Sequence, residues 1–266
     1  MSILGLFKKK KTPIRENGSS MIAMVAVSSE NLPDAIKLND FISVHWPDSP
    51  LINDASANGQ TLTFNIGGAI AAVSLMPVPI PWEEIKGPCA TAWYWPEATT
   101  IMKRHKFHLI VALMKSPFDK VGTALLLTKL VAAVASLVDA DGIYLGAGTL
   151  VHSTENFIEQ AKEMSLEFLP LYLWIDFRVQ KEANDKYTLF TTGLVSLGLM
   201  EIEILNSEHK PPELIDKAFN IGHYLLDKGP ILKDGDTIGV SVNEKIFIRH
   251  LPSIWDSNKE VYRLAF

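Results

Sequence analysis

The sequence is poor in cysteine and has no excess of positive charge. Its 266 residues include one cysteine, Cys89, which excludes an intramolecular disulfide and fits a reducing compartment, so we expect a cytoplasmic protein. The 25 Lys and Arg residues are outnumbered by 30 Asp and Glu, giving a net charge of −5. Neutralising nucleic-acid phosphates requires a basic surface. We therefore expect no nucleic-acid partner.

The sequence also lacks the common motifs of nucleotide and calcium sites. Residues 146–149, GAGT, lie between an expected strand and an expected helix, where backbone amides can hold an anion. However, Val151 stands at the third glycine position of a dinucleotide fingerprint, and no Walker lysine follows. We interpret the glycines as turn residues, and likewise Asp234 and Asp236, which lack calcium-loop spacing. We expect no cofactor and no metal.

A long apolar run is missing from the N-terminus. Its short apolar stretch precedes a lysine cluster, the reverse of the order in a secretory signal, and is too short to span a bilayer. We expect a flexible basic tail over residues 1–20. The alternative is weak contact of this tail with a membrane surface or a partner. The contacting residues would be Ile3, Leu4, Leu6, Phe7, Lys8, Lys9, Lys10 and Lys11.

Apolar periodicity predicts alternating strands and helices in the first half of the chain. The helix expected at 119–138 is apolar on most of its surface but carries Lys120 and Lys129, which favours a core helix over a membrane span. Gly67 and Gly68 suit a tight hairpin turn. The other expected elements are strands at 21–29, 62–66, 69–76, 107–114 and 142–148, a helix from Asn31 to His45, a helix at 88–105, and a helix from Ser153 to Met164.

The second half repeats this theme. The segment 172–180 alternates, with Leu173, Ile175, Phe177 and Val179 on one face; we expect Asp176 and Arg178 on the other face to form a solvated pair. Further strands are expected at 186–198, 200–206, 238–242, 245–250 and 261–266, with a helix from Pro211 to about Asp227 that ends at Gly229.

These elements predict an α+β fold, an α/β sandwich of mixed, largely antiparallel sheets with helices packed on one face. We place an N-terminal α/β half at 21–165 and a C-terminal α+β half of similar size at 166–266. One fused domain is the alternative.

Several phrases occur in an order that resembles a known family: LMPVPIPW, GPCATAWYWPEA, HLIVAL, GIYLGAGTLVHS, LPLYLWIDFRV, FTTGLVSLGLMEIEI and LKDGDTIG. They resemble the bacterial family called domain of unknown function 4261, over nearly all of the chain from residue 21 and most closely at 77–97 and 170–240. The resemblance implies a bacterial, cytoplasmic protein and no particular activity. It also suggests a place among genes of interbacterial competition, as an immunity or accessory protein.

Two constellations could carry chemistry. Cys89 follows Pro88 at an expected helix start, and with His108 and His152 it could form a nucleophilic site near the GAGT turn. The alternative is that Cys89 is a small buried hydrophobe. A metal site would draw on His105, His108, His152, Glu97 and Asp141. However, the imidazoles of His105 and His108 need not converge, and a single cysteine excludes a thiolate zinc site.

The densest aromatic stretch lies at 82–97. Core packing explains one or two of its aromatic residues, whereas an exposed set could line a groove for a protein partner. The neighbouring carboxylates would make that groove acidic. The expected binding residues are Trp82, Glu83, Glu84, Trp93, Tyr94, Trp95 and Glu97.

Two functions remain for the structure to address. The first is a non-catalytic, cytoplasmic bacterial protein-binding module whose partner is a toxin or a secretion-system component. The second is a small hydrolase or transferase that uses Cys89, His108 and His152.

Overall fold

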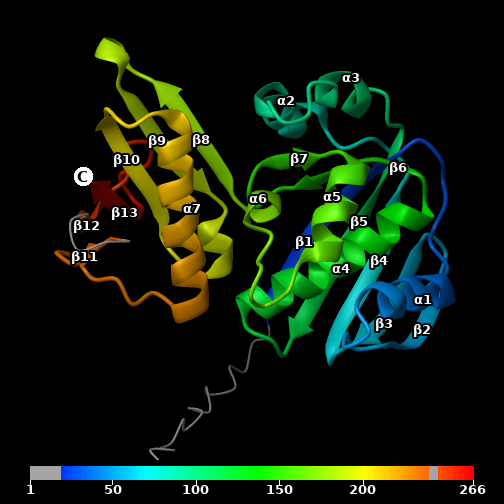
Figure 1. Ribbon diagram of the computed structural model, residues 1–266. Helices are drawn as coiled ribbons and strands as arrows, with labels where there is room; N and C mark the ends of the chain where they lie inside the picture. Colours follow the sequence, from blue (N-terminus) through cyan, green and yellow to red (C-terminus); the bar gives the residue numbers. More distant parts are fainter. Residues whose placement is uncertain (1–18, 240–244) are drawn as a thin grey trace, which may run out of the picture.

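A computed structural model describes residues 19–239 and 245–266 of the chain. Residues 1–18 of the predicted N-terminal tail, including its membrane-contact residues, lie outside the described residues. The last two tail residues, Ser19 and Ser20, are not a flexible tail but the start of strand β1 (Ser19–Val27). Within the described part, the protein has the predicted α+β fold, built from a seven-stranded and a six-stranded sheet that lie side by side with their helices (Figure 1).

The first sheet contains strands from residues 19 to 152 in the order β2-β3-β4-β5-β1-β6-β7, and each neighbouring pair is antiparallel. The inner strand β1, between β5 and β6, carries apolar side chains on both faces, as expected for a strand covered on both sides. The strands are β1 (Ser19–Val27), β2 (Ile52–Asn58), β3 (Thr61–Ile66), β4 (Ala69–Met76), β5 (Phe107–Ser116), β6 (Ala140–Leu145) and β7 (Leu150–His152).

Helices cover both faces of this sheet. On one face, α4 (Lys120–Leu137) packs on β1, β5 and β6 and against α1 (Ala35–His45) and α5 (Thr154–Glu163). On the other face, the short helices α2 (Trp82–Thr91) and α3 (Ala98–Met102) cover β6 and β7. The expected one-sided packing therefore fits α1, α4 and α5, whereas α2 and α3 cover a second apolar surface that includes Ala26, Tyr144 and Val151.

Helix α4 is the one helix in the described ranges that is long and apolar enough to cross a membrane, and 67% of it is buried inside the protein. This burial is that of a core helix, as predicted. The helix begins after Asp119, whose carboxylate accepts the Gly122 N–H at 2.7 Å and so satisfies one of the free amides of the first turn.

The second sheet has the order β11-β12-β13-β10-β9-β8 and is antiparallel except between β10 and β13. Helix α7 (Pro211–Lys228) packs against β8, β9 and β10. The remaining elements are α6 (Leu171–Trp174), β8 (Asp176–Lys181), the 3-10 turns Ala183–Asp185 and Leu194–Leu197, β9 (Tyr187–Thr192), β10 (Glu201–Ser207), β11 (Thr237–Ile238), β12 (Ile246–Pro252) and β13 (Glu260–Ala265).

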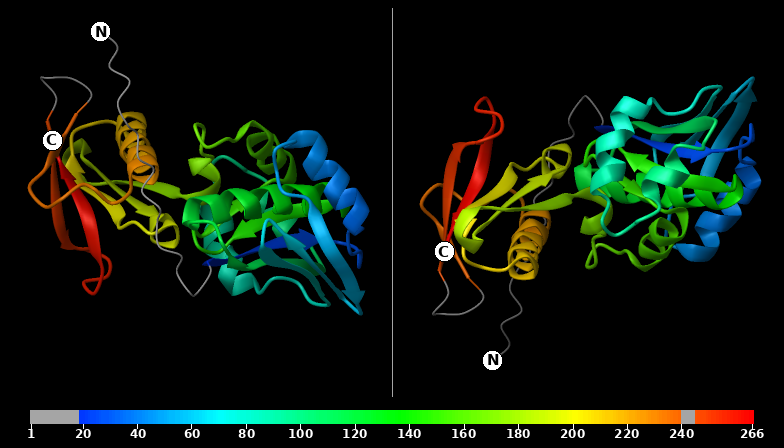
Figure 2. Two further views of the ribbon diagram at one scale, coloured as in Figure 1. Left: turned by 90° about the horizontal axis from the view of Figure 1, so that it is seen from below. Right: turned by 90° about the horizontal axis from the view of Figure 1, so that it is seen from above.

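The two halves meet around the backbone carbonyl of Trp174 at the end of α6. A Cβ atom added at Gly148 would lie 2.5 Å from this oxygen, and one added at Gly193 would lie 2.3 Å from it. The Trp174 indole also donates to Thr128 Oγ1 of α4 at 2.9 Å. One apolar cluster runs from Ala23 in β1 to Leu264 in β13, so the halves share buried contacts. Figure 2 shows β8 extending from the second sheet toward the first half.

Candidate functional site

A cavity of about 520 Å³ lies where the two halves meet, a size typical of ligand pockets. We call it the inter-half cavity. The first half contributes the segment after α2, β7 and α5, and the second half contributes α6, β8 and α7. Its lining residues are Trp93, Tyr94, Leu150, His152, Asn156, Gln160, Tyr172, Ile175, Asp176, Phe177, Pro212, Ile215 and Asp216.

Two predicted binding residues, Trp93 and Tyr94, form one wall of this cavity. Helix α2 ends at Thr91, and the chain turns there through a Trp93 N–H···O=C Thr91 hydrogen bond of 2.9 Å. Tyr94 then donates its hydroxyl to the carbonyl of Val151 at 3.0 Å, which is accessible because β7 is an edge strand. Trp93 is held edge-on to the Tyr94 ring but is 78% exposed. The cavity thus has a large apolar side chain at its mouth.

His152 lies behind Tyr94, with the two rings stacked at a centroid distance of 5.8 Å. It is 1% exposed, and burial lowers the pKa of its ring to about 4. The Nε2 atom lies 3.1 Å from the carbonyl of Leu173, which can only accept, so Nε2 carries the proton. The other nitrogen, Nδ1, is buried and has no hydrogen-bond partner. His152 therefore presents an unused acceptor beside the cavity.

Asp176 and Arg178, predicted to be a solvated pair, connect the two halves at this site. Arg178 pairs with Asp176 and also donates to Thr91 Oγ1 at 3.0 Å. Asp176 lines the cavity, and burial raises the pKa of its carboxyl group against the opposing effect of Arg178. The pKa of the Tyr94 phenol is also raised, first by burial and second by the charge of Asp176.

The opposite wall is formed by α6 and α7. The Tyr172 ring stacks on Phe219 at 4.9 Å and meets Phe177 edge-on at 5.7 Å. Asp216 is exposed and makes no hydrogen bond or ion pair with another described residue, but its charge adds to burial in raising the pKa of Tyr172. No Lys or Arg lines the described cavity, so its charged lining groups are both carboxylates.

The other predicted binding residues lie away from this lining. Trp95 is 7% exposed and packs among core residues such as Met102. It is therefore one of the aromatic residues explained by core packing, and it is not available to a partner. Trp82 is half-buried, with the Lys103 ammonium 5.0 Å above its ring. The carboxylates of this segment are exposed and form no ion pair within the described ranges: Glu83, Glu84 and Glu97.

The structure does not bring Cys89, His108 and His152 together. His108 lies in β5, in register with Ala26 and thus on the face that α2 and α3 cover, whereas His152 pairs with Ile143 on the α4 face. His108 Nδ1 lies 2.8 Å from the Val78 carbonyl. Cys89 is 5% exposed, and burial raises the pKa of its thiol to about 11, which disfavours the thiolate.

His105, weighed as a metal ligand, has both ring nitrogens occupied. Nε2 accepts the backbone N–H of Ile80 at 2.7 Å, so Nδ1 must carry the proton that it donates to the Met102 carbonyl. Burial lowers the pKa of this ring. Over residues 19–239 and 245–266, no three His, Cys, Asp or Glu side chains are grouped so as to hold a metal ion.

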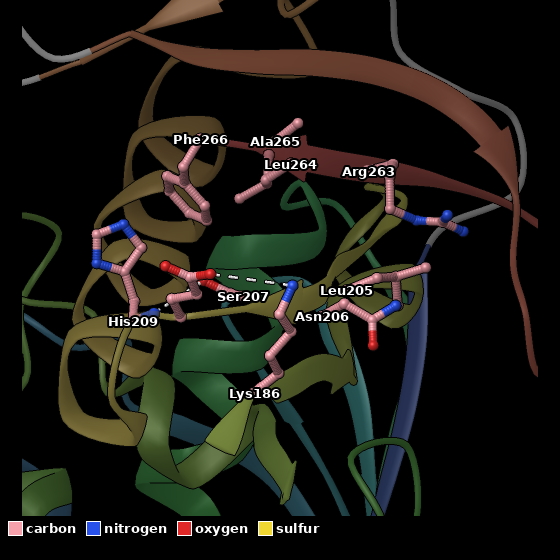
Figure 3. A pocket seen from close by; sticks show the side chains of 10 residues that line it. Lys186, Leu205, Asn206, Ser207, His209, Arg263, Leu264, Ala265 and Phe266 are labelled. Carbon is pink, nitrogen blue, oxygen red and sulfur yellow. Dashed lines mark hydrogen bonds and ion pairs between the residues drawn. The ribbon is translucent and has the colours of Figure 1, made fainter. Parts of the chain in front are cut away.

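A second cavity of about 560 Å³ lies between the end of β10 and the C-terminus (Figure 3). Its basic groups are already paired with carboxylates. Lys186 is 4.0 Å from Glu208, Arg263 is 2.7 Å from Glu203, and His209 is 3.0 Å from Glu213. These pairs leave little net positive charge for an anionic ligand, so the inter-half cavity is the stronger candidate of these two.

Sequence analysis did not identify the cavity-lining residues that come from the C-terminal half of the chain. Tyr172, Asp176 and Asp216 lie 78 to 122 residues beyond Tyr94 in the chain, and no local pattern connects them. The alternating pattern that places Asp176 opposite the apolar face was recognised, but Asp176 was interpreted as part of a solvated pair with Arg178. The glycines of GAGT gave a usable signal, since Gly148 marks the close approach between the halves.

Comparison with known proteins confirms the family resemblance over the C-terminal half. Residues 190–265 match the model of the family described as domain of unknown function (DUF4261). This match covers β10, α7 and β11 to β13 with their connections. The resemblance noted at 77–97 lies outside it and stays a prediction. No curated protein and no solved structure matches the chain.

Proposed function

We propose that this protein is a non-catalytic protein-binding module whose binding site is the inter-half cavity with Trp93 at its mouth. The observation that carries the proposal is the 78% exposure of Trp93 beside a cavity with further aromatic walls. Tryptophan and tyrosine supply large contact areas at low entropic cost and are frequent at the energetic centres of interfaces.

The charge of the cavity selects the kind of partner. Asp176 and Asp216 line it without any lysine or arginine in the lining, and the whole protein is acidic. Complementary charge accelerates association and suppresses partners of like charge. The proposed occupant is therefore a positively charged segment of another protein.

An immunity or accessory role in interbacterial competition is the most concrete form of this proposal. The partner would be a toxin or a secretion-system component in the bacterial cytoplasm. The acidic, aromatic cavity supports the protein-binding part of this role; the matched family is one of unknown function, and the role in competition comes from the resemblance alone. No observation favours the alternative of a hydrolase or transferase, since Cys89, His108 and His152 do not converge.

Selection of phage-displayed peptides against the purified protein tests the proposal. Peptides that use the cavity should bind Trp93→Ala about 30-fold or more weakly, since truncating a central interface residue costs about 2 kcal/mol or more. The matched control is Trp255→Ala, which removes an exposed tryptophan of the β12–β13 connection that does not line the cavity. Selected peptides that bind Trp93→Ala as well as the wild type would contradict the proposal.

A further inference from the structure

The inter-half cavity combines negative charge with flat aromatic surfaces. Its two charged side chains are Asp176 and Asp216. Asp176 is largely balanced by Arg178, whereas Asp216 has no hydrogen bond or ion pair with another described residue. A cation entering the cavity would therefore find one uncompensated carboxylate on α7.

Aromatic rings line the cavity on both halves. Trp93 and Tyr94 come from the first half, and Tyr172 and Phe177 come from the second. The faces of such rings carry negative potential and attract cations, most often a guanidinium group that stacks against them. A compact ammonium is more strongly hydrated and gains less from stacking.

His152 supplies the third element, a buried acceptor without a donor. Its Nε2–H is used by Leu173, and its Nδ1 has no partner although the residue lines the cavity. The atom is covered, so a donor reaches it once the stacked Tyr94 ring moves aside. That ring is held by one hydrogen bond from its hydroxyl to Val151 and is partly exposed. A hydrogen bond to a buried acceptor that otherwise has no partner lowers the free energy of the bound state.

We infer that the inter-half cavity binds a guanidinium group, supplied by an arginine side chain of the protein partner. The inference rests on the proposed function and names the chemistry of the same site. The guanidinium would donate two N–H groups to Asp216, stack on the ring of Tyr172, and direct a further N–H to His152 Nδ1 after the Tyr94 ring has moved aside. At the rim the chain already holds its own guanidinium in this manner, since Arg178 pairs with Asp176 and lies 5.9 Å from the Phe190 ring centroid.

The direct test is an NMR titration of the full-length protein with N-acetyl-L-arginine amide. The side-chain ¹⁵N resonances of the histidines and the indole resonances are followed, with Trp93→Phe used for assignment. The inference predicts saturable shifts of Trp93 and an upfield shift of His152 Nδ1 as it accepts a hydrogen bond. N-acetyl-L-lysine amide, of equal charge, should bind more weakly. Equal binding of both amides, or an unchanged His152 Nδ1, would overturn the inference.

Two variants on α7 distinguish binding through the cavity carboxylate from nonspecific attraction by the negative charge of the whole protein. Asp216→Asn should weaken binding of the arginine amide about tenfold, equivalent to about 1.4 kcal/mol. Asp227→Asn removes the same charge from an exposed position at the other end of the helix and should leave binding unchanged. Both positions are exposed, so neither change threatens folding. An equal loss in both variants would overturn the inference.

Two further comparisons test the source of the guanidinium and the proposed function separately. Tighter binding of free L-arginine than of its capped amide would indicate a small-molecule site and overturn the partner's arginine as the source. Peptides that depend on Trp93 but contain no arginine would overturn this inference and leave the protein-binding proposal intact. Peptide binding that is independent of Trp93 would instead contradict the proposed function.

Discussion

His105 and His152, two of the histidines considered for chemistry, are neutral structural groups. Both have pKa values lowered by burial, and in each ring one N–H donates to a backbone carbonyl. The two rings differ in their second nitrogen, which accepts from Ile80 in His105 and is unpartnered in His152. That difference marks His152 as the histidine able to serve a ligand.

The depressed pKa of His152 predicts a pH-dependent stability. Its ring titrates at about 4 in the folded protein and near 6.5 in an exposed histidine. The unfolded state therefore binds more protons between these values, and the free energy of unfolding should fall by up to about 3 kcal/mol as the pH drops from about 6.5 to about 4.

Urea denaturation across this pH range measures the effect. His152→Gln keeps an N–H near Leu173 but removes the titrating ring, so its unfolding free energy should vary less with pH than that of the wild type. The remaining slope in both proteins includes His105, whose pKa is also lowered. Parallel curves for wild type and variant would show that His152 is not the group responsible.

At the residue scale, two of the residues that the sequence analysis named, Trp93 and Tyr94, lie in the lining of the inter-half cavity. Trp93 and Tyr94 could be named because aromatic residues in a short proline-containing segment rarely all fit into a core. Trp95, two positions beyond Trp93, could not be distinguished from them, since its burial depends on contacts with α3 and on Gly142 in β6. Exposure is set by packing partners that are distant in sequence.

Among the elements, helix α1 has a different N-terminal cap residue from the start that the sequence predicted. This helix was predicted to start at Asn31, but it begins at Ala35, and Asp34 accepts the amides of Ile36 and Lys37 at 3.0 and 3.1 Å. Pro33 therefore precedes the cap and lies outside the helix.

Removal of the true cap should destabilise the protein. Asp34→Ala should lower the free energy of unfolding by about 1 kcal/mol, because two first-turn amides lose their acceptor. Asn31→Ala is the control, since the Asn31 side chain only donates to Ser29 on the surface, and it should change stability little. Denaturant unfolding of both variants decides the assignment. A larger loss for Asn31→Ala than for Asp34→Ala would contradict it.

Elements that depend on local sequence patterns were predicted well. Elements that depend on pairing with a distant strand or on tertiary contacts were not. The β3–β4 hairpin at Gly67 and Gly68, α4 and α7 lie where expected, since their periodicity and turn residues are local. Strand β2 was missed because it is a polar edge strand whose only partner is β3. The helix predicted at 88–105 is two helices, and the segment predicted as a strand from 172 begins as α6.

For the whole molecule, the contact of Gly148 with Trp174 should control how the halves fit together. Gly148→Ala would place a Cβ 2.5 Å from a backbone oxygen, an overlap that only a backbone shift can relieve. Overpacking of this kind costs about 1–3 kcal/mol. We expect a corresponding loss in the free energy of unfolding and weaker binding at the inter-half cavity.

Gly87→Ala provides the control for this prediction. Gly87 lies within α2, and a Cβ there would meet no atom within 4 Å. Alanine favours a helix over glycine, so this variant should be as stable as the wild type or slightly more stable. Equal stability of Gly148→Ala and Gly87→Ala would refute the proposed contact.

The arrangement of the halves is what the sequence could not provide. The expected division near residues 165–170 falls between α5 and α6, but the shared apolar cluster and the cavity arise from contacts between residues far apart in the chain. Nothing in the local pattern around Asp216 indicates that it faces Tyr172.

The most direct test of the central claim is site-specific photo-crosslinking in cells that produce the protein from its own gene. p-Benzoylphenylalanine replaces Trp93 in one strain and Trp255 in another. We predict one dominant protein adduct at position 93, attached through a segment that contains arginine, and no such adduct at position 255. Absence of an adduct at position 93, or the same adducts at both positions, would contradict the claim that the inter-half cavity is the partner-binding site.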